Sequence, residues 1–176
     1  MAYTLTVGAV SRQLQPVQVS ATKSLLLIEL LGDTELTNAV ADAMVALVPP
    51  GCDLIFTVAT SAIPLAHALS ERTGLPYLVA RKRRRTYMDH PLIQEVESMT
   101  LGVGETLWLD GRHVERVRGK KAVLLTDVVV SGSTLAAMAR LVERAGGVVV
   151  GRLAAFARTG ATDLGDISAV ATLPKS

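Results

Sequence analysis

The feature that most limits the fold of this chain is a strand–helix–strand pattern that occurs twice. Each unit has an apolar run of strand length, an amphipathic helix and a second strand: residues 53–58, 61–74 and 76–80 in the first, and 121–125, 133–144 and 148–150 in the second. Such units place their strands in parallel, and continuous apolar runs are typical of strands covered on both faces. The pattern therefore predicts an α/β fold, an open parallel sheet flanked by helices.

The helix boundaries carry local signals. Residues 34–47 repeat apolar side chains on one helical stripe, and Pro49-Pro50-Gly51 ends that helix. The helix of the first unit has Ser61 as its expected cap, Pro64 in its first turn and Gly74 as its stop. These signals predict where these two helices begin and end.

A long polar excursion separates the two units. It follows the cationic run Arg81-Lys82-Arg83-Arg84-Arg85, and within it we expect Val96–Leu101 and Thr106–Leu109 to pair as a hairpin. Asp110-Gly111 is a typical turn dipeptide. Because a long excursion from a compact core more often serves a binding site than fills space, we interpret residues 83–118 as a flexible hairpin flap over the site.

Composition excludes several classes of protein. A chain of 176 residues with 49% apolar content has enough material for one core, so we expect a single domain over residues 1–176. No apolar stretch is long enough to span a membrane. A net charge of +2 does not favour a nucleic-acid partner, and the single cysteine, Cys52, cannot form an internal disulfide. We expect a cytoplasmic protein.

The segment most specific for chemistry is KAVLLTDVVVSGSTL, residues 121–135. A buried strand delivers Asp127 near its carboxyl end, and Ser131-Gly132-Ser133-Thr134 opens directly into a helix. Unpaired amides and the positive end of the helix dipole suit a phosphate there, and a glycine lets the backbone approach it closely. The same residues also fit an ordinary capped helix after a strand.

This segment resembles the phosphoribosyl pyrophosphate signature of type I phosphoribosyltransferases. The resemblance extends over residues 53–151 and is nearest to the adenine and hypoxanthine/guanine members. Its other pieces follow in the family's order: Val58-Ala59-Thr60-Ser61-Ala62 at the pyrophosphate loop, Ala80-Arg81-Lys82 at the basic pair, and Leu109-Asp110-Gly111 at the turn after the flap.

The resemblance implies a role for each matching residue. Asp127 would hold a ribose hydroxyl and contact Mg²⁺, and Thr126 would contact the substrate beside it. The loop Ala59, Thr60, Ser61 and Ala62 would bind pyrophosphate. Arg81 and Lys82 would stabilise charge on the departing pyrophosphate. The remaining contacts would come from the phosphate-binding residues Ser131, Gly132, Ser133 and Thr134 and, in the flap, from Tyr87 and Ser98.

The family also implies a small hood for the base, which we place in about residues 1–32 and 156–176. Strands are expected at Tyr3–Val7, Leu25–Leu30 and Ile167–Leu173, and Phe156 is the candidate to stack on the base. The expected partners are phosphoribosyl pyrophosphate and a purine base, adenine first and hypoxanthine or guanine next. A homodimer is expected from the resemblance alone.

Three departures from the family pattern leave a second function open. Thr126 stands where the first of two adjacent acids is usual, and Ala59 and Ala62 replace an acid and a glycine. Ser133 replaces a frequent second glycine. Because binding can survive where catalysis does not, the alternative is a non-catalytic sensor of this fold that binds phosphoribosyl pyrophosphate or a nucleotide and regulates a partner.

Overall fold

The computed structural model of the chain describes residues 2–21, 23–97, 104–159 and 166–174. Its centre is a five-stranded sheet in the order β11-β10-β9-β5-β6, and every neighbouring pair in it is parallel. The strands are β5 (Leu54–Val58), β6 (Tyr77–Ala80), β9 (Lys121–Val129), β10 (Val148–Arg158) and β11 (Ile167–Leu173). The predicted open parallel sheet is therefore confirmed, and β9 continues four residues beyond its expected end at Leu125.

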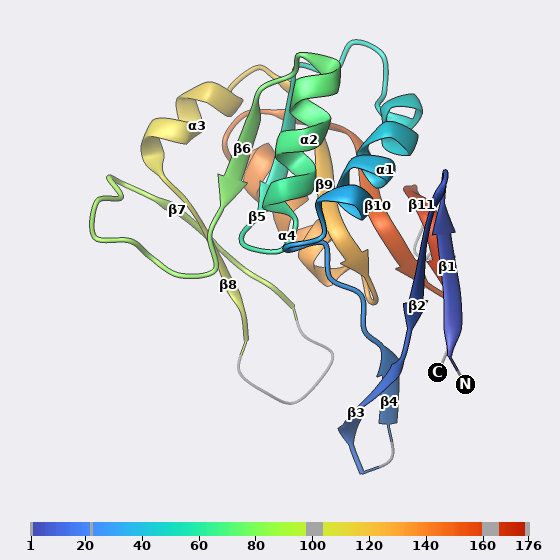
Figure 1. The fold of residues 1–176 in the computed structure, drawn as a ribbon. Coiled ribbons are helices and arrows are strands. Elements are labelled where there is room, and N and C mark those ends of the chain that lie inside the picture. The colour runs from blue at the N-terminus through green and yellow to red at the C-terminus, as the bar shows by residue number, and fades with distance from the viewer. Residues whose placement is uncertain (1, 22, 98–103, 160–165, 175–176) are drawn as a thin grey trace.

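Helices cover both faces of the sheet (Figure 1). On one face lie α1 (Thr34–Met44), which a short 3-10 turn at Val45–Leu47 extends, and α2 (Ile63–Thr73); their apolar side chains pack with Ile55 and Leu125. On the other face lies α4 (Ser133–Arg144), whose stripe packs with Phe56 and Leu124. Successive side chains along β5 and β9 point to opposite faces of the sheet, and each face is covered by a core. These strands are therefore apolar throughout and do not alternate between apolar and polar residues.

The ends of α2 follow two of the three expected signals, and the first of these is Pro64 in the first turn. Gly74 ends the helix in the left-handed conformation with φ of 70°, as expected from the sequence. The start is different, because Ala62 and not Ser61 is the cap residue, and it makes no side-chain capping hydrogen bond. The prediction of Ser61 as a cap was therefore wrong, and the amides of this first turn are left without a capping side chain.

The excursion between the two units is built differently from the predicted hairpin. The strands that pair are β7 (Leu92–Glu95) and β8 (Thr106–Leu109), antiparallel, so a hairpin and its strand at Thr106–Leu109 are confirmed. The expected partner strand Val96–Leu101 was wrong, because Thr106–Leu109 pairs with Leu92–Glu95; residues 98–101 of that prediction lie outside the described residues. Arg144 donates a hydrogen bond to the Ile93 carbonyl, and Arg140 pairs with Glu97 at 2.6 Å. These contacts hold β7 against α4, so the base of the excursion belongs to the body of the protein.

Asp110-Gly111, expected as a turn, begins a helix instead. The Asp110 carboxylate accepts a hydrogen bond from the Arg112 amide at 3.0 Å and caps α3 (Gly111–Val117). The Arg112 guanidinium binds the same carboxylate, with Nη2 2.5 Å from Oδ2. Asp110 is 3% exposed, and its hydrogen bonds with Arg112 lower its pKa to about 2. This ion pair, in which the carboxylate is buried and the guanidinium is exposed, fixes the start of α3 beside β8.

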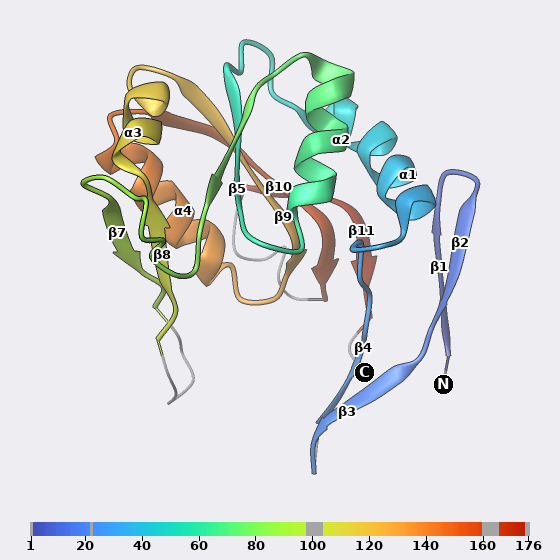
Figure 2. The same cartoon turned by 60° about the vertical axis from the view of Figure 1, so that its left-hand side comes forward.

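The N-terminal residues form two hairpins at the edge of the body. β1 (Tyr3–Val7) pairs with β2 (Val10–Leu14), and β3 (Pro16–Ser20) pairs with β4 (Lys23–Leu26). The second hairpin projects away from the sheet (Figure 2). It contains only part of the strand that we expected at Leu25–Leu30.

The C-terminal part of the expected hood spans residues 156–176, of which 156–159 and 166–174 are described. Phe156 to Arg158 are the last residues of β10, and Ile167–Leu173 is β11, the outer strand of the main sheet. Parallel pairing with β10 makes this segment the edge strand of the main sheet, so the strand expected at Ile167–Leu173 is confirmed. Within the described residues, no helix is long and apolar enough to cross a membrane.

The Asp110 capping pair should contribute to stability in a pH-dependent way. We expect Asp110→Ala to lower the free energy of unfolding by about 2 kcal/mol near neutral pH, because it removes a cap and leaves Arg112 unpaired. Since the folded pKa of about 2 lies below the ordinary 3.8, the carboxylate stabilises the fold above 3.8 and loses this effect as the pH falls toward 2.

Urea unfolding of wild type and Asp110→Ala between pH 7 and pH 2 measures this difference. The difference in the free energy of unfolding between the two proteins should become smaller as the pH falls. Asp89→Ala, an exposed carboxylate nearby, should change stability little at any pH. A gap that is constant with pH would contradict the proposed role of the carboxylate charge.

Candidate functional site

The sheet has one point at which the chain changes direction, between β5 and β9. From β5 the chain passes through α2 to β6 on one side, and from β9 it passes through α4 to β10 on the other. The two helices cover opposite faces, so the loops that follow β5 and β9 diverge at the carboxyl edge of the sheet, where the strand arrows end in Figure 1. In open α/β sheets such a crevice is where ligands bind.

The loop after β9 presents backbone amides to this crevice. Gly132 precedes α4 with φ of 74°, and the helix begins without a side-chain cap. The hydroxyls of Ser131 and Ser133 lie 2.9 Å apart, and Thr134 follows in the first turn. Because the first amides of a helix have no partner within it, this turn has donors for an anion and the favourable end of the helix dipole.

Only one carboxylate stands at the end of β9. Asp127 is half-buried, whereas Thr126 is 5% exposed and donates from Oγ1 to the Asp127 carboxylate at 3.4 Å. The Thr126 hydroxyl therefore supports Asp127 from a buried position. The described residues contain no group of three metal-ligating side chains.

The loop after β5 offers backbone more than side chains. Ala59 and Ala62 are buried, Thr60 is exposed, and the Ala59–Thr60 peptide is cis. The Ala59 amide donates to the Ala80 carbonyl at 2.9 Å, which ties the loop to the end of β6. Thr60 and Ser61 are thus the side chains of this loop that remain available to a ligand.

The basic pair that follows β6 lies beside this loop. A pocket of about 400 Å³, here called the cleft pocket, is lined by Leu31, Ala59, Thr60, Ser61, Arg81, Lys82, Arg83 and Arg85. Lys82 forms an ion pair with Glu105 at 2.9 Å, in which both side chains are about half exposed. The structure therefore brings two predicted pieces, residues 59–61 and the basic pair, into one cavity, and an anion bound there would compete with Glu105 for Lys82.

Three predicted contacts need separate comment. Phe156 is completely buried in β10, in the core shared with α1 and α2, so it cannot stack on a ligand and that prediction was wrong. Tyr87 is 57% exposed and lines a different pocket, away from the 59–61 loop. Ser98 lies outside the described residues.

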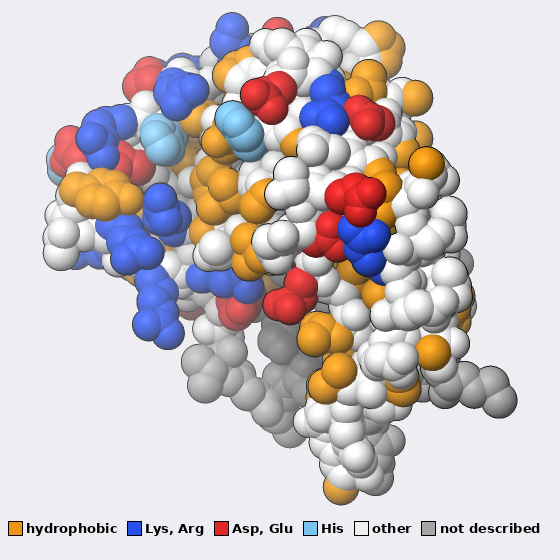
Figure 3. Space-filling view, viewed as in Figure 1, with side chains coloured by type: hydrophobic (Ala, Val, Ile, Leu, Met, Phe, Trp, Pro, Cys, Tyr) orange, Lys and Arg blue, Asp and Glu red, His pale blue; other side chains and the backbone are white. Residues whose placement is uncertain are grey.

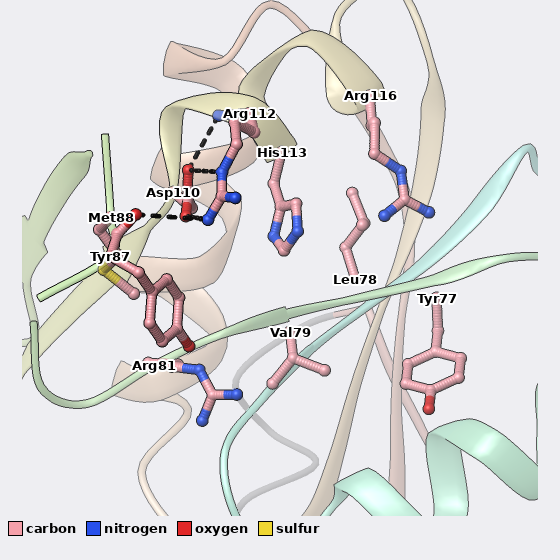
Figure 4. Close-up of a pocket in the computed structure, with 10 residues that line it drawn as sticks. All are labelled: Tyr77, Leu78, Val79, Arg81, Tyr87, Met88, Asp110, Arg112, His113 and Arg116. Atoms are coloured by element: carbon pink, nitrogen blue, oxygen red, sulfur yellow. Dashed lines mark hydrogen bonds and ion pairs between the residues drawn. The ribbon is translucent and has the colours of Figure 1, made fainter. Parts of the chain in front are cut away.

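Sequence reasoning missed the helix α3 and the charged side chains that it carries. Arg112, His113 and Arg116 line a pocket beside the edge strand β6 (Figure 4). The signal that could have found them is Asp110 before apolar Val114 and Val117, the spacing of a capped helix.

Comparison with known proteins matches this arrangement to one family. Residues 39–172 match the phosphoribosyl transferase domain. An orotate phosphoribosyltransferase from Methanopyrus kandleri is 33% identical over 112 residues, which cover 64% of this chain and 50% of that protein. A hypoxanthine/guanine phosphoribosyltransferase from Methanococcus vannielii is 32% identical over 116 residues, covering 66% of this chain and 59% of that protein. The chain thus spans between half and three-fifths of the length of these curated relatives.

The fold itself is matched over a greater length. The crystal structure of an adenine phosphoribosyltransferase from Thermoanaerobacter pseudethanolicus superposes with a TM-score of 0.75 at 22% identity. The match covers 91% of this chain and 95% of that chain. The sheet, its helices and the crevice between them therefore follow the architecture of that protein.

The left-handed backbone at Gly132 gives a stability prediction. A side chain at φ of 74° is strained, so Gly132→Ala should lower the free energy of unfolding by about 1 kcal/mol. The matched control is Gly104→Ala, where φ is not in that region and the new methyl group would meet no atom within 4 Å. Chemical unfolding of the two variants measures the difference, and equal stabilities would contradict the strained geometry.

Proposed function

The chain belongs to the phosphoribosyl transferase domain family, and we propose that it transfers a 5-phosphoribosyl group from phosphoribosyl pyrophosphate to a purine base. The products are the nucleotide and pyrophosphate. The observation that carries this proposal is the crevice at the change of direction, where an uncapped helix start and a basic cavity flank one carboxylate, Asp127.

Each part of the crevice suits one part of the donor substrate. The amides and hydroxyls of residues 131–134 bind the 5′-phosphate, and Asp127 accepts hydrogen bonds from the ribose hydroxyls. The 59–61 loop and the Arg81 and Lys82 side chains bind the pyrophosphate. In this arrangement the anomeric carbon lies between the two anion sites.

In the reaction, a ring nitrogen of the base bonds to the anomeric carbon as the bond from that carbon to pyrophosphate breaks. The bonding electrons leave with pyrophosphate, and the N–H proton of the base passes to a pyrophosphate oxygen or to water. Positive charge develops on the ribose and negative charge on the departing group. Because no side chain forms a covalent intermediate, the protein contributes through placement and electrostatics: Asp127 faces the positive charge, and Arg81 and Lys82 face the negative charge.

The family resemblance implies Mg²⁺, and the donors present fit it in a limited way. Mg²⁺ is commonly held by one or two carboxylates together with substrate phosphates and water. Asp127 is the carboxylate at the end of β9, so the ion would be held by the pyrophosphate and ribose oxygens with Asp127 beside it. When bound, it neutralises charge on the departing phosphates.

A purine is the proposed acceptor, adenine first and hypoxanthine or guanine next. The fold likeness to an adenine enzyme and the sequence relatives named for hypoxanthine and guanine support this choice. With Phe156 excluded, the apolar side chain that faces the cleft pocket is Leu31, which is 46% exposed and able to contact a base. A homodimer and a cytoplasmic location stay predictions.

One observation favours a second candidate function. Thr126 occupies the place of the first of the two adjacent acids usual in the family, so the ribose hydroxyls and the metal have one carboxylate, Asp127, instead of two. Loss of a charged contact that acts in the transition state slows turnover by roughly a hundredfold. A sensor that binds phosphoribosyl pyrophosphate or a nucleotide without turnover is therefore the alternative.

Turnover and binding measured side by side distinguish the two functions. The purified protein is incubated with phosphoribosyl pyrophosphate, Mg²⁺ and adenine, hypoxanthine, guanine, xanthine, uracil or orotate in turn, and nucleotide is detected by chromatography. We expect nucleotide from one purine. Calorimetric binding of phosphoribosyl pyrophosphate without any nucleotide product would favour the sensor, and absence of both would contradict the site.

Asp127 should control donor binding without controlling the fold. We expect Asp127→Asn to weaken phosphoribosyl pyrophosphate affinity by about a hundredfold, because charged hydrogen bonds to both ribose hydroxyls are lost. The matched control is Asp53→Asn at the opposite end of the same strands, where the carboxylate accepts from the Lys121 amide at 2.8 Å. Unchanged affinity in Asp127→Asn, or equal loss in both variants, would mean that the crevice is misassigned.

A further inference from the structure

A second cavity, here called the outer pocket, lies beside the free edge of β6 under α3. Its volume is about 520 Å³, and it is lined by Tyr77, Leu78, Val79, Arg81, Tyr87, Met88, Asp110, Arg112, His113 and Arg116. Figure 4 shows His113 pointing from α3 toward β6, between Arg112 and Arg116, with Tyr87 and Arg81 on the near side. The floor is apolar strand and the walls are cationic and aromatic.

The charge of the outer pocket is unbalanced. Three arginines face one carboxylate, Asp110, which Arg112 already binds. Among the described residues, neither Arg81 nor Arg116 has a carboxylate within ion-pair distance. In Figure 3, Lys and Arg side chains gather on the side of the molecule that carries α3. An anion is the ligand that would compensate this excess.

His113 adds an independent observation. Its Nδ1 atom is buried without a hydrogen-bond partner among the described residues. Burial, and then the charges of Arg116, Arg112 and Arg81, lower the pKa of His113, while Asp110 opposes them. A buried polar atom without a partner is costly, so a ligand whose binding turns the His113 ring and accepts a hydrogen bond from Nδ1 would remove that cost.

We propose that the outer pocket is a second anion site, which binds the phosphate group of a small phosphorylated ligand through Arg112, His113 and Arg116. Phosphate oxygens accept from two guanidinium groups and from the imidazole, and Tyr77 and the apolar floor leave room for an attached nucleoside. Apart from Arg81, its lining residues differ from those of the cleft pocket that we assign to the donor substrate.

Arg81 connects the two cavities. It lines both the outer pocket and the cleft pocket, and its backbone is held by two hydrogen bonds to Trp108, at 2.9 and 2.7 Å. With the backbone fixed, its guanidinium can bind an anion in one pocket or in the other. Phosphate in the outer pocket should therefore weaken binding of pyrophosphate-bearing ligands in the cleft by about fivefold, and the effect is reciprocal.

The imidazole resonance of His113 reports on the site directly. Inorganic phosphate and AMP are titrated separately into the full-length protein at constant ionic strength, and the three histidines are followed by NMR. With either probe we expect a saturable shift of His113 and a raised His113 pKa, because a nearby anion favours the protonated imidazole. Tighter binding of AMP would assign the site to nucleotides, and equal binding would assign it to free phosphate. The exposed His67 and His90 serve as internal references.

Variants separate this site from the crevice. Arg116→Gln should weaken the His113 response about tenfold. Arg118→Gln, whose side chain pairs with Glu115 outside the pocket, should not change it. Asp127→Asn should leave the response intact, because Asp127 belongs to the other site. The weakening of phosphoribosyl pyrophosphate affinity by phosphate should disappear in Arg116→Gln.

Three results would overturn the proposal. One is a His113 resonance that neither phosphate nor AMP moves. Another is a response that is lost in Asp127→Asn but kept in Arg116→Gln. The third is a His113 shift that depends on protein concentration without added phosphate, which would mean that a second copy of the chain fills the pocket. Because donor binding in the crevice is measured separately, failure here leaves the proposed function standing.

Discussion

The structure depends on the pairing of β5 with β9 at the centre of the sheet. These strands are buried on both faces, and the Thr57 hydroxyl donates to the Leu125 carbonyl at 2.8 Å between them. Because one strand leads to a helix on the front face and the other to a helix on the back, their following loops separate and leave a crevice. The loop after β5, the turn at residues 131–134 and Asp127 take their positions from this one pairing.

The excursion between the two units is less regular than the sheet, yet its base is firmly attached to the body of the protein. Arg140 and Arg144 of α4 hold β7, and the Asp110–Arg112 pair fixes α3 beside β8. This attachment has two consequences for charge. Lys82, which lines the cleft pocket, pairs with Glu105, and Arg81 lines the outer pocket together with the arginines of α3. Because Arg81 lies between the two cationic cavities, it can couple anion binding in one to anion binding in the other without any change in the fold.

The sequence predicts the sheet well because continuous apolar runs such as Leu54–Val58 have few other places in a folded chain. It predicts α3 poorly because an Asp-Gly pair can form a turn or begin a helix. In both cases the carboxylate accepts a hydrogen bond from a nearby backbone amide. The strand that pairs with β8 is β7, and β7 is held by a contact with α4 about 50 residues farther along the chain. No local sequence pattern contains such a contact. The burial of Phe156 likewise follows from pairing of β10 with strands on both sides.

The central claim is that a sugar phosphate is bound by the amides and hydroxyls at the start of α4. A crystal structure of the protein with ribose 5-phosphate tests it most directly, since this ligand carries the phosphate and the ribose hydroxyls but no pyrophosphate or base. The account predicts phosphate density within hydrogen-bonding distance of residues 131–134 and ribose hydroxyls against Asp127. Phosphate density elsewhere, with the turn at Gly132 empty at saturating ligand, would contradict it.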